Sequence, residues 1–185
     1  VFDGREHIPL FTIPGMRDRT IKIGSAGKKF SLTGWKVGFV CAAPPLLRVT
    51  AKVHQFLTFT TPPNLQTAVA RGLAKPDDYF VEMRRDLARR RDRLTRGLED
   101  IGFPVLPSQG TYFLPVDLAP LGLNETDQAF CRRIVTAHKV AAIPVSAFYE
   151  KDAVASVVRF CFAKKDATLD AALERLSDAV RRCRR

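Results

Sequence analysis

The feature that most constrains this fold is a run of apolar residues at helical spacing in the middle of the chain. The apolar positions recur three, four or seven residues apart and are Phe80, Met83, Leu87, Leu94, Leu98 and Ile101. Asp77 and Asp78 follow Lys75-Pro76 as a plausible N-cap, and Gly102 is a typical stop. The pattern predicts one long amphipathic helix, and we expect a domain boundary where it begins.

The residues before this helix predict the first domain, residues 1–74. We expect a turn-rich connector at 1–20, a strand at 20–23 and a second, buried strand at 37–42. Helices are expected at 44–54 and 63–74. Residues 24–27 are too small and flexible to continue a packed strand, so the first strand is expected to end before them.

The residues from the helix onward predict the second domain, residues 75–185. Strands are expected at 103–106, 110–117, 140–143 and 157–163. Helices are expected at 125–138 and from residue 166, the latter with Leu169, Leu173, Leu176 and Val180 on one face. This order predicts helices packed on a small sheet, an α+β sandwich.

The charge is strongly basic, and it raises the possibility of an anionic partner. Lys and Arg number 30 against 19 Asp and Glu, a formal charge of +11. Seven arginines crowd the long helix, but Asp86 and Asp92 lie among them, which favours a solvated helix face over nucleic-acid binding. No apolar run approaches the roughly 20 residues that cross a bilayer, so no membrane partner is expected.

The cysteine pattern argues against a metal site and a disulfide framework. Cys41, Cys131, Cys161 and Cys183 form no C-x-x-C pair and have no histidine at ligand spacing. Free, buried thiols in a reducing cytoplasm fit this pattern best.

The segment 24–38, GSAGKKFSLTGWKVG, is the most informative for chemistry. Its small residues would let backbone N–H groups and the Ser25 hydroxyl approach an anion, with Lys28 and Lys36 nearby. A glycine-rich turn with surface lysines is the alternative. The segment matches neither a Walker loop nor a G-x-G-x-x-G fingerprint. By itself, Arg159 in an apolar strand most often signals a structural ion pair.

Four blocks in order nevertheless resemble the class I/II pyridoxal-phosphate aminotransferases. Ser25-Ala26-Gly27-Lys28 is similar to the family's Ser-x-(Gly/Ser/Ala)-Lys signature, and residues 110–113, 140–149 and 158–172 supply the other blocks. The flanks look closest to the kynurenine, methionine and N-succinyldiaminopimelate branch. The resemblance implies an α/β fold, partial fold type I: residues 1–74 end the large cofactor-binding domain, and residues 75–185 form the small domain.

The resemblance also implies roles for five residues. Lys28 would bind pyridoxal 5'-phosphate covalently and shuttle a proton, while Ser25 and Lys36 would contact the cofactor phosphate. Lys36 stands where most members carry arginine, and it lacks the bidentate fork. Arg159 would bind the substrate α-carboxylate. Phe59 would reach the neighbouring subunit's substrate pocket.

The implied activity is transfer of an amino group between an amino acid and a 2-oxo acid, in a cytoplasmic homodimer. Cysteine-S-conjugate β-lyase activity in the same family is an open alternative, and so is a non-catalytic basic fragment with a structural or anion-binding role. The family's upstream asparagine block, its pyridine-binding aspartate and its tyrosine near the cofactor hydroxyl have no counterpart in this sequence. The chain therefore resembles a C-terminal half, and we expect weak activity and uncovered apolar surface.

Overall fold

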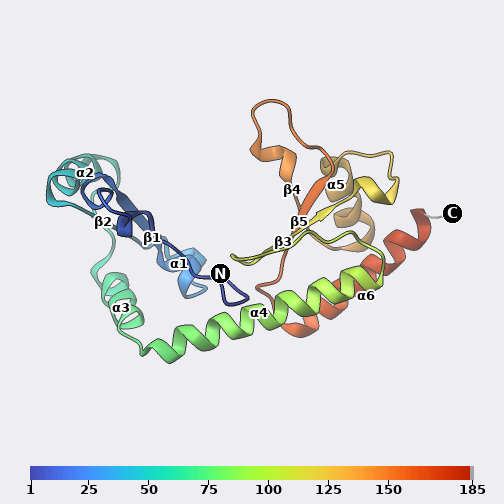
Figure 1. Cartoon of the computed structure of the whole chain (residues 1–185), viewed down its shortest axis with the longest axis horizontal. Coiled ribbons are helices and arrows are strands. Elements are labelled where there is room, and N and C mark those ends of the chain that lie inside the picture. The colour runs from blue at the N-terminus through green and yellow to red at the C-terminus, as the bar shows by residue number, and fades with distance from the viewer. Residues whose placement is uncertain (184–185) are drawn as a thin grey trace. The chain divides into compact units, whose positions relative to one another are not determined.

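The computed structural model describes residues 1–183, with side chains through Ala179, and divides into two compact units (Figure 1). One unit is Glu6–Tyr79, and the other joins Val1–Arg5 to the chain from Phe80 onward. Val180 and Cys183, named above, lie outside the described side chains.

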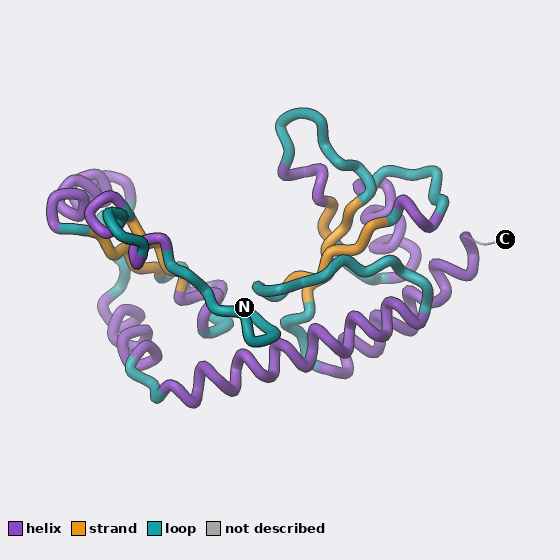
Figure 2. The backbone as a smooth tube through the Cα atoms, viewed as in Figure 1, coloured by secondary structure: helices purple, strands orange, loops and turns teal. Residues whose placement is uncertain are grey.

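In its described residues, the later unit has three long helices and a three-stranded antiparallel sheet (Figure 2). The strands lie in the order β3 (Phe113–Asp117), β5 (Val157–Cys161), β4 (Ile143–Pro144). The helices are α4 (Asp77–Asp100), α5 (Asp127–His138) and α6 (Asp166–Cys183). Short 3-10 turns are η4 (Ala119–Leu121) and η5 (Val145–Phe148).

Strand alternation divides the side chains of this sheet between a core face and an open face. Val158 and Phe160 of β5 are buried, whereas Arg159 between them is partly exposed and points to the opposite face. The core is a single cluster that takes residues from the sheet and all three helices. Its most enclosed members include Leu98, Leu114, Val116, Phe130, Ile134, Val158, Phe162 and Leu176.

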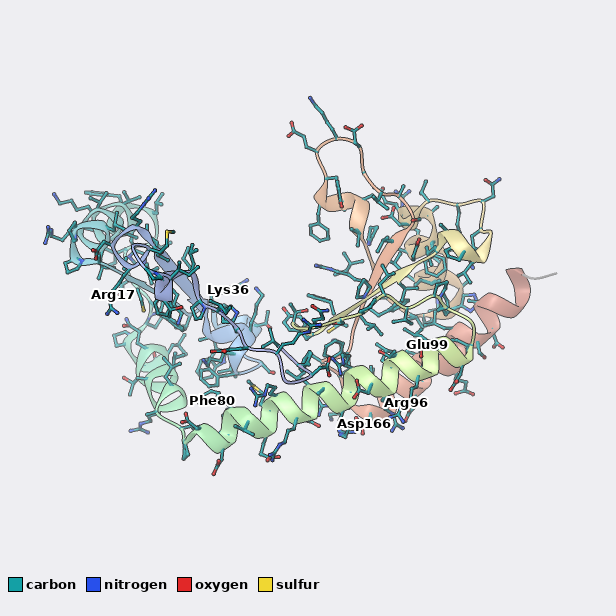
Figure 3. The ribbon with its side chains drawn as sticks, in the orientation of Figure 1. Arg17, Lys36, Phe80, Arg96, Glu99 and Asp166 are labelled. Carbon is teal, nitrogen blue, oxygen red and sulfur yellow. The ribbon has the colours of Figure 1, made fainter. Side chains whose placement is uncertain are left out.

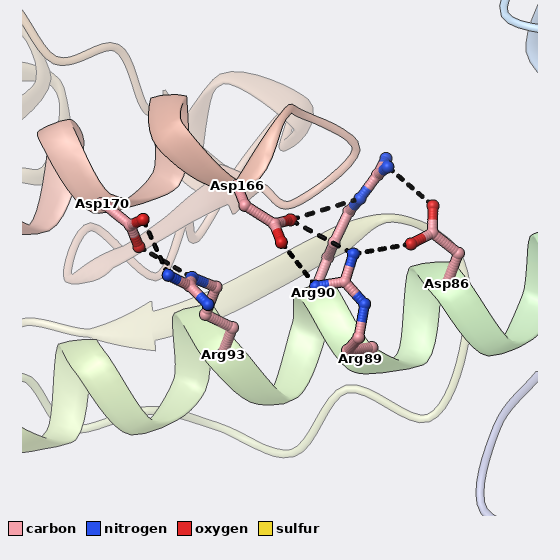
Figure 4. A network of polar contacts seen from close by, with 6 residues as sticks. All are labelled: Asp86, Arg89, Arg90, Arg93, Asp166 and Asp170. Carbon is pink, nitrogen blue, oxygen red and sulfur yellow. Dashed lines mark hydrogen bonds and ion pairs between the residues drawn. The ribbon is translucent and has the colours of Figure 1, made fainter.

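The arginine-rich face of α4 is largely exposed to solvent, as the sequence predicts, and it also forms ion pairs with α6. Arg89 and Arg93 contact α6 through Asp166 and Asp170, with shortest distances of 2.6 and 2.7 Å (Figure 4). Asp86 pairs with Arg89 and Arg90 within α4. These carboxylates neutralise part of the positive charge of the helix, which weakens the case for a nucleic-acid surface.

The Glu6–Tyr79 unit is built on a two-stranded antiparallel sheet. Its strands are β1 (Ile21–Ser25) and β2 (Gly38–Ala42), and its helices are α1 (Ala26–Lys29), α2 (Pro44–Leu57) and α3 (Pro63–Leu73). Turns η1 (Leu10–Thr12), η2 (Arg17–Arg19) and η3 (Thr33–Trp35) complete it. Its buried core is small and comprises Ala26, Val37 and Val69 with Phe30 and Leu65 packed against them.

Two expectations for this unit are wrong. The first strand does not end before Gly24, because Gly24 and Ser25 pair with Phe39 and Gly38. A side chain at Gly24 would overlap the Phe39 ring at 2.1 Å, so glycine suits the strand here. The strand β2 is also mostly exposed rather than buried.

All four strands expected in the later unit are shorter in the structure, and the last, expected at 157–163, ends at Cys161. Residues 103–106 contribute only an isolated bridge, Val105 to Val116, since Pro104 and Pro107 interrupt regular pairing. The strand expected from Gly110 begins at Phe113, after Thr111 adopts a left-handed φ of 64°. Val140 donates its N–H to Ile134 at the end of α5, which removes it from the strand expected at 140–143.

The described thiols are free, but they are not all buried. Cys131 is buried, Cys161 is partly exposed and Cys41 is exposed. Burial, with the nearby Asp127 charge, raises the pKa of the Cys131 thiol to about 11. Within residues 1–183, no helix has the length and apolar character needed to cross a bilayer.

Candidate functional site

The connection between β1 and β2 brings three of the sequence-predicted residues into one closed loop. Ser25 pairs in register with Gly38, and the Ala26 N–H donates to the Val37 carbonyl at 3.0 Å. Ser25 therefore begins the connection, and Lys28 lies on α1 within it. Lys36 lies at its end (Figure 3). Because β1 and β2 pair up to the point where the loop begins and ends, the spacing between these residues is fixed.

Backbone hydrogen bonds and a close approach at Gly27 hold this loop in a compact conformation. The Leu32 N–H donates to Gly27 at 2.8 Å, and the Trp35 N–H donates to Leu32 at 3.0 Å. A Cβ at Gly27 would lie 3.2 Å from the Leu32 oxygen and the Thr33 Cα, so a larger residue would push the loop open. Lys36 has a left-handed φ of 54°, a conformation that ends η3 and returns the chain to β2.

The polar groups of this loop are available to a ligand. Ser25 is exposed, and its side chain makes no capping bond to α1. Lys28 and Lys36 are exposed, and neither forms an ion pair with any of the described residues. A hydroxyl donor and two ammonium groups on one short connection suit a phosphate better than they suit an apolar ligand.

Phe59 lies outside this loop, just after α2. Its side chain is 74% exposed and its φ is 60°, which is unusual for a bulky residue. The left-handed turn follows the end of α2, where the Phe59 N–H donates to His54. The structure thus presents Phe59 as an exposed aromatic side chain on a sharp turn.

Arg159 occupies the open face of the sheet in the later unit, opposite the core. Its cross-strand neighbours are Pro115 on β3 and Ile143 on β4. Among the described residues its side chain forms no ion pair, so the structural ion pair suggested by a lone strand arginine is absent there. Its Nε is buried and has no hydrogen-bond partner in the described part of the chain.

The sequence did not indicate that two aromatic rings flank the Arg159 guanidinium. The Arg159 Cζ lies 4.1 Å from the centre of the Phe113 ring and 4.5 Å from that of Phe148. Phe113 stands two residues from the cross-strand partner of Arg159, so alternation could have placed it on the same face. Nothing in the sequence indicated Phe148, because a turn, not a strand, positions it.

Comparison with known proteins identifies the family. A family model described as "Aminotransferase class I and II" matches residues 6–176. The chain belongs to this family. The resemblance inferred from the lysine, glycine-threonine and arginine blocks is therefore confirmed.

Individual aminotransferases match over nearly the whole chain. A probable N-succinyldiaminopimelate aminotransferase from Mycobacterium tuberculosis is 42% identical over 186 residues, covering 96% of this chain and 47% of the relative. The methionine aminotransferase of Escherichia coli is 37% identical, covering 95% of this chain and 45% of that protein. The chain spans about half the length of the curated relatives it matches.

Solved structures agree on the fold. The N-succinyldiaminopimelate aminotransferase structure from Mycobacterium tuberculosis superimposes with a TM-score of 0.91 at 44% identity, covering 96% of this chain and 46% of that one. An aromatic aminotransferase from Pyrococcus horikoshii superimposes with a TM-score of 0.86 at 27% identity and covers 98% of this chain and 48% of that one. The predicted α/β class, a partial fold type I, is confirmed.

Proposed function

We propose that this chain carries the lysine and carboxylate-binding parts of a pyridoxal-phosphate-dependent aminotransferase. The reaction would transfer an amino group between an amino acid and a 2-oxo acid. The observation that carries the proposal is the closed β1–β2 connection with Ser25, Lys28 and Lys36, in a chain that belongs to the class I and II family.

The residues of this loop fit the cofactor's phosphate and its reactive carbon. The Ser25 hydroxyl can donate to a phosphate oxygen, and the Lys36 ammonium can supply charge without the bidentate geometry of arginine. Pyridoxal phosphate, when bound, would supply an electron-withdrawing ring that stabilises negative charge at the substrate Cα.

Lys28 would supply the amine of the site. Its Nζ is a primary amine that can attach covalently to the cofactor, and when free it can accept and return a proton. Lys29 is adjacent but outside the family spacing.

Arg159 would bind the substrate carboxylate. A guanidinium mounted on a central strand is rigid, and its planar nitrogens match a carboxylate in a fork. The buried Nε without a partner among the described residues supports this role, since such a group is costly without an acceptor.

The remaining parts of the proposal concern domains and assembly. Glu6–Tyr79 would be the end of the large domain, expected at residues 1–74, and the later unit would be the small domain, expected at 75–185. Phe59 would reach the substrate pocket of a second subunit in a cytoplasmic homodimer, which its 74% exposure allows.

The test is to locate the lysine that reacts with the cofactor. The chain is incubated with pyridoxal phosphate, reduced with borohydride, denatured, and examined by intact mass and peptide mapping. We expect one adduct on Lys28, lost in Lys28→Arg and retained in the matched control Lys29→Arg. Labelling scattered over many lysines, or an unchanged adduct in Lys28→Arg, would overturn the proposed site.

A further inference from the structure

Arg159 is held between two aromatic rings that come from opposite sides of its strand. Phe113 belongs to β3 and Phe148 ends η5, which follows β4. Because β5 lies between β3 and β4, the two rings approach the guanidinium from the two flanking strands. Rings stacked on a guanidinium leave its edge nitrogens free to bind a planar acceptor.

The two rings are supported very differently. Phe113 is part of a strand, and its ring lies 4.5 Å from that of Tyr112. Phe148 is 62% exposed and lies outside any strand. Core packing therefore does not account for its position, and something else must hold η5.

Asp127, at the start of α5, holds η5. Its carboxylate Oδ2 accepts from the Ser146 backbone N–H at 2.8 Å, and Oδ1 accepts from the Ser146 hydroxyl at 2.7 Å. Oδ1 also accepts from the Gln128 N–H at 2.8 Å. The Asp127 side chain is fully buried, so these three hydrogen bonds replace the water it has lost.

Asp127 also holds the other end of the same segment. Its own N–H donates to the Ala155 carbonyl at 2.7 Å, just before β5 begins. One residue thus closes the connection between β4 and β5 at Ser146 and at Ala155. Phe148 lies two residues from the first of these anchors.

We propose that Asp127 is a positioning residue for carboxylate recognition: through Ser146 it fixes η5 so that Phe148 stacks on Arg159 opposite Phe113. This rests on the proposed role of Arg159 in binding the substrate carboxylate. Asp127 and Ser146 touch no substrate, and they act by holding a ring against the guanidinium.

The test follows the Arg159 guanidinium directly by NMR of the nitrogen-15-labelled chain. The readouts are the Nε–H resonance of Arg159, which the stacked rings shift, and its displacement on titration with pyruvate, a 2-oxo acid with one carboxylate. Phe148→Leu removes one ring and Ser146→Ala removes one anchoring hydrogen bond. Ser146→Thr keeps the hydroxyl, and Tyr149→Ala removes a neighbouring exposed aromatic as the matched control.

We expect Phe148→Leu and Ser146→Ala to move the Arg159 resonance toward that of an unstacked arginine. Both should weaken pyruvate binding, by roughly fivefold for Phe148→Leu, in line with the loss of a cation–π contact. Ser146→Thr should restore both readouts, Tyr149→Ala should change neither, and the melting temperature of Phe148→Leu should match that of the parent chain. Asp127→Asn is informative if it folds, and the other variants do not depend on it.

The outcomes separate this inference from the proposed function. If pyruvate moves the Arg159 resonance with equal affinity in Phe148→Leu, Ser146→Ala and the parent chain, the positioning role is overturned while Arg159 remains a carboxylate ligand. A second outcome is that the substitution Phe148→Leu shifts the Arg159 resonance but pyruvate does not shift it in the parent chain. That result would overturn the carboxylate site itself.

Discussion

The two units of this chain differ in how much apolar surface they bury. Among the described residues, the later unit encloses sixteen buried residues in one cluster, drawn from its sheet, its three helices, the segments that connect them and Phe2. The Glu6–Tyr79 unit encloses three, and it leaves Ile23, Phe56, Leu57 and Phe59 between 74 and 86% exposed. Burial of apolar area is the main favourable term in folding, so the later unit should hold most of the stability.

The single tryptophan makes this comparison measurable. Trp35 belongs to the Glu6–Tyr79 unit, so its fluorescence reports that unit alone. Far-UV circular dichroism is dominated by the helices of both units. If the units unfold independently, the fluorescence transition in urea should come at a lower concentration than the final dichroism transition.

The largest effect should come from the core of the later unit. Leu98 is fully enclosed, and Leu98→Ala should lower the free energy of unfolding by about 4 kcal/mol through lost burial and a cavity. The dichroism transition should shift while the Trp35 transition stays in place. The control is Val53→Ala, at a 52% exposed position, which should shift neither. Equal shifts of both transitions in Leu98→Ala would mean that the units unfold together.

Phe2→Ala should have the next largest effect, about 3 kcal/mol. Phe2 is 5% exposed, its ring centre lies 6.1 Å from that of Phe162, and its N–H donates to Gln109. Although residue 2 precedes the Glu6–Tyr79 unit in sequence, the dichroism transition should be the one that moves. Movement of the Trp35 transition alone would assign these first residues to the other unit.

A smaller loss of stability should follow from adding a side chain at Gly97, where α4 packs against α6. A Cβ at Gly97 would lie 2.3 Å from the Leu173 Cδ1, so Gly97→Ala should destabilise the later unit by about 2 kcal/mol despite alanine's better helix propensity. Adding Leu173→Ala should remove the overlap, so the double variant should lose less than the sum of the single changes. Additive losses in this cycle would show that the two side chains do not meet.

The smallest effect should be a pH dependence confined to the contact between α4 and α6. The Arg89 guanidinium lowers the pKa of Asp166 and that of Arg93 lowers the pKa of Asp170, both below the ordinary 3.8. A lowered pKa means that these pairs stabilise the fold above pH 3.8 and lose that contribution as the pH falls through the lowered values.

This last prediction is checked by melting temperatures at two pH values. The double change of Asp166 and Asp170 to Asn should lower the melting temperature slightly at pH 7 and leave it unchanged near pH 2. The control is Asp178→Asn, an exposed position on α6, which should have no effect at either pH. Because these side chains are all at least partly exposed, added salt should reduce the difference at pH 7. A difference that persists near pH 2 would argue against ion pairing as its cause.

The sequence alone was sufficient to predict the long elements. The helices α4, α5 and α6 were predicted within a few residues, because their apolar periodicity is a local property of the chain. The same holds for the family, since four short motifs in order need no tertiary contact to be recognised. The roles of Ser25, Lys28, Lys36, Arg159 and Phe59 stay predictions.

The tertiary structure decided what depends on residues distant in sequence. The strands β3 and β4 begin later than their apolar residues predict, because Thr111 turns the chain before Phe113 and Val140 bonds back to α5. The exposure of β2 could not be read from its apolar residues, because burial requires a neighbouring surface. The stacking of Phe113 and Phe148 on Arg159, with Asp127 and Ser146 behind it, unites four segments. Strand alternation could have indicated Phe113 alone. Phe148, Ser146 and Asp127 are ordinary residues in their own segments, and only the tertiary fold brings them to Arg159.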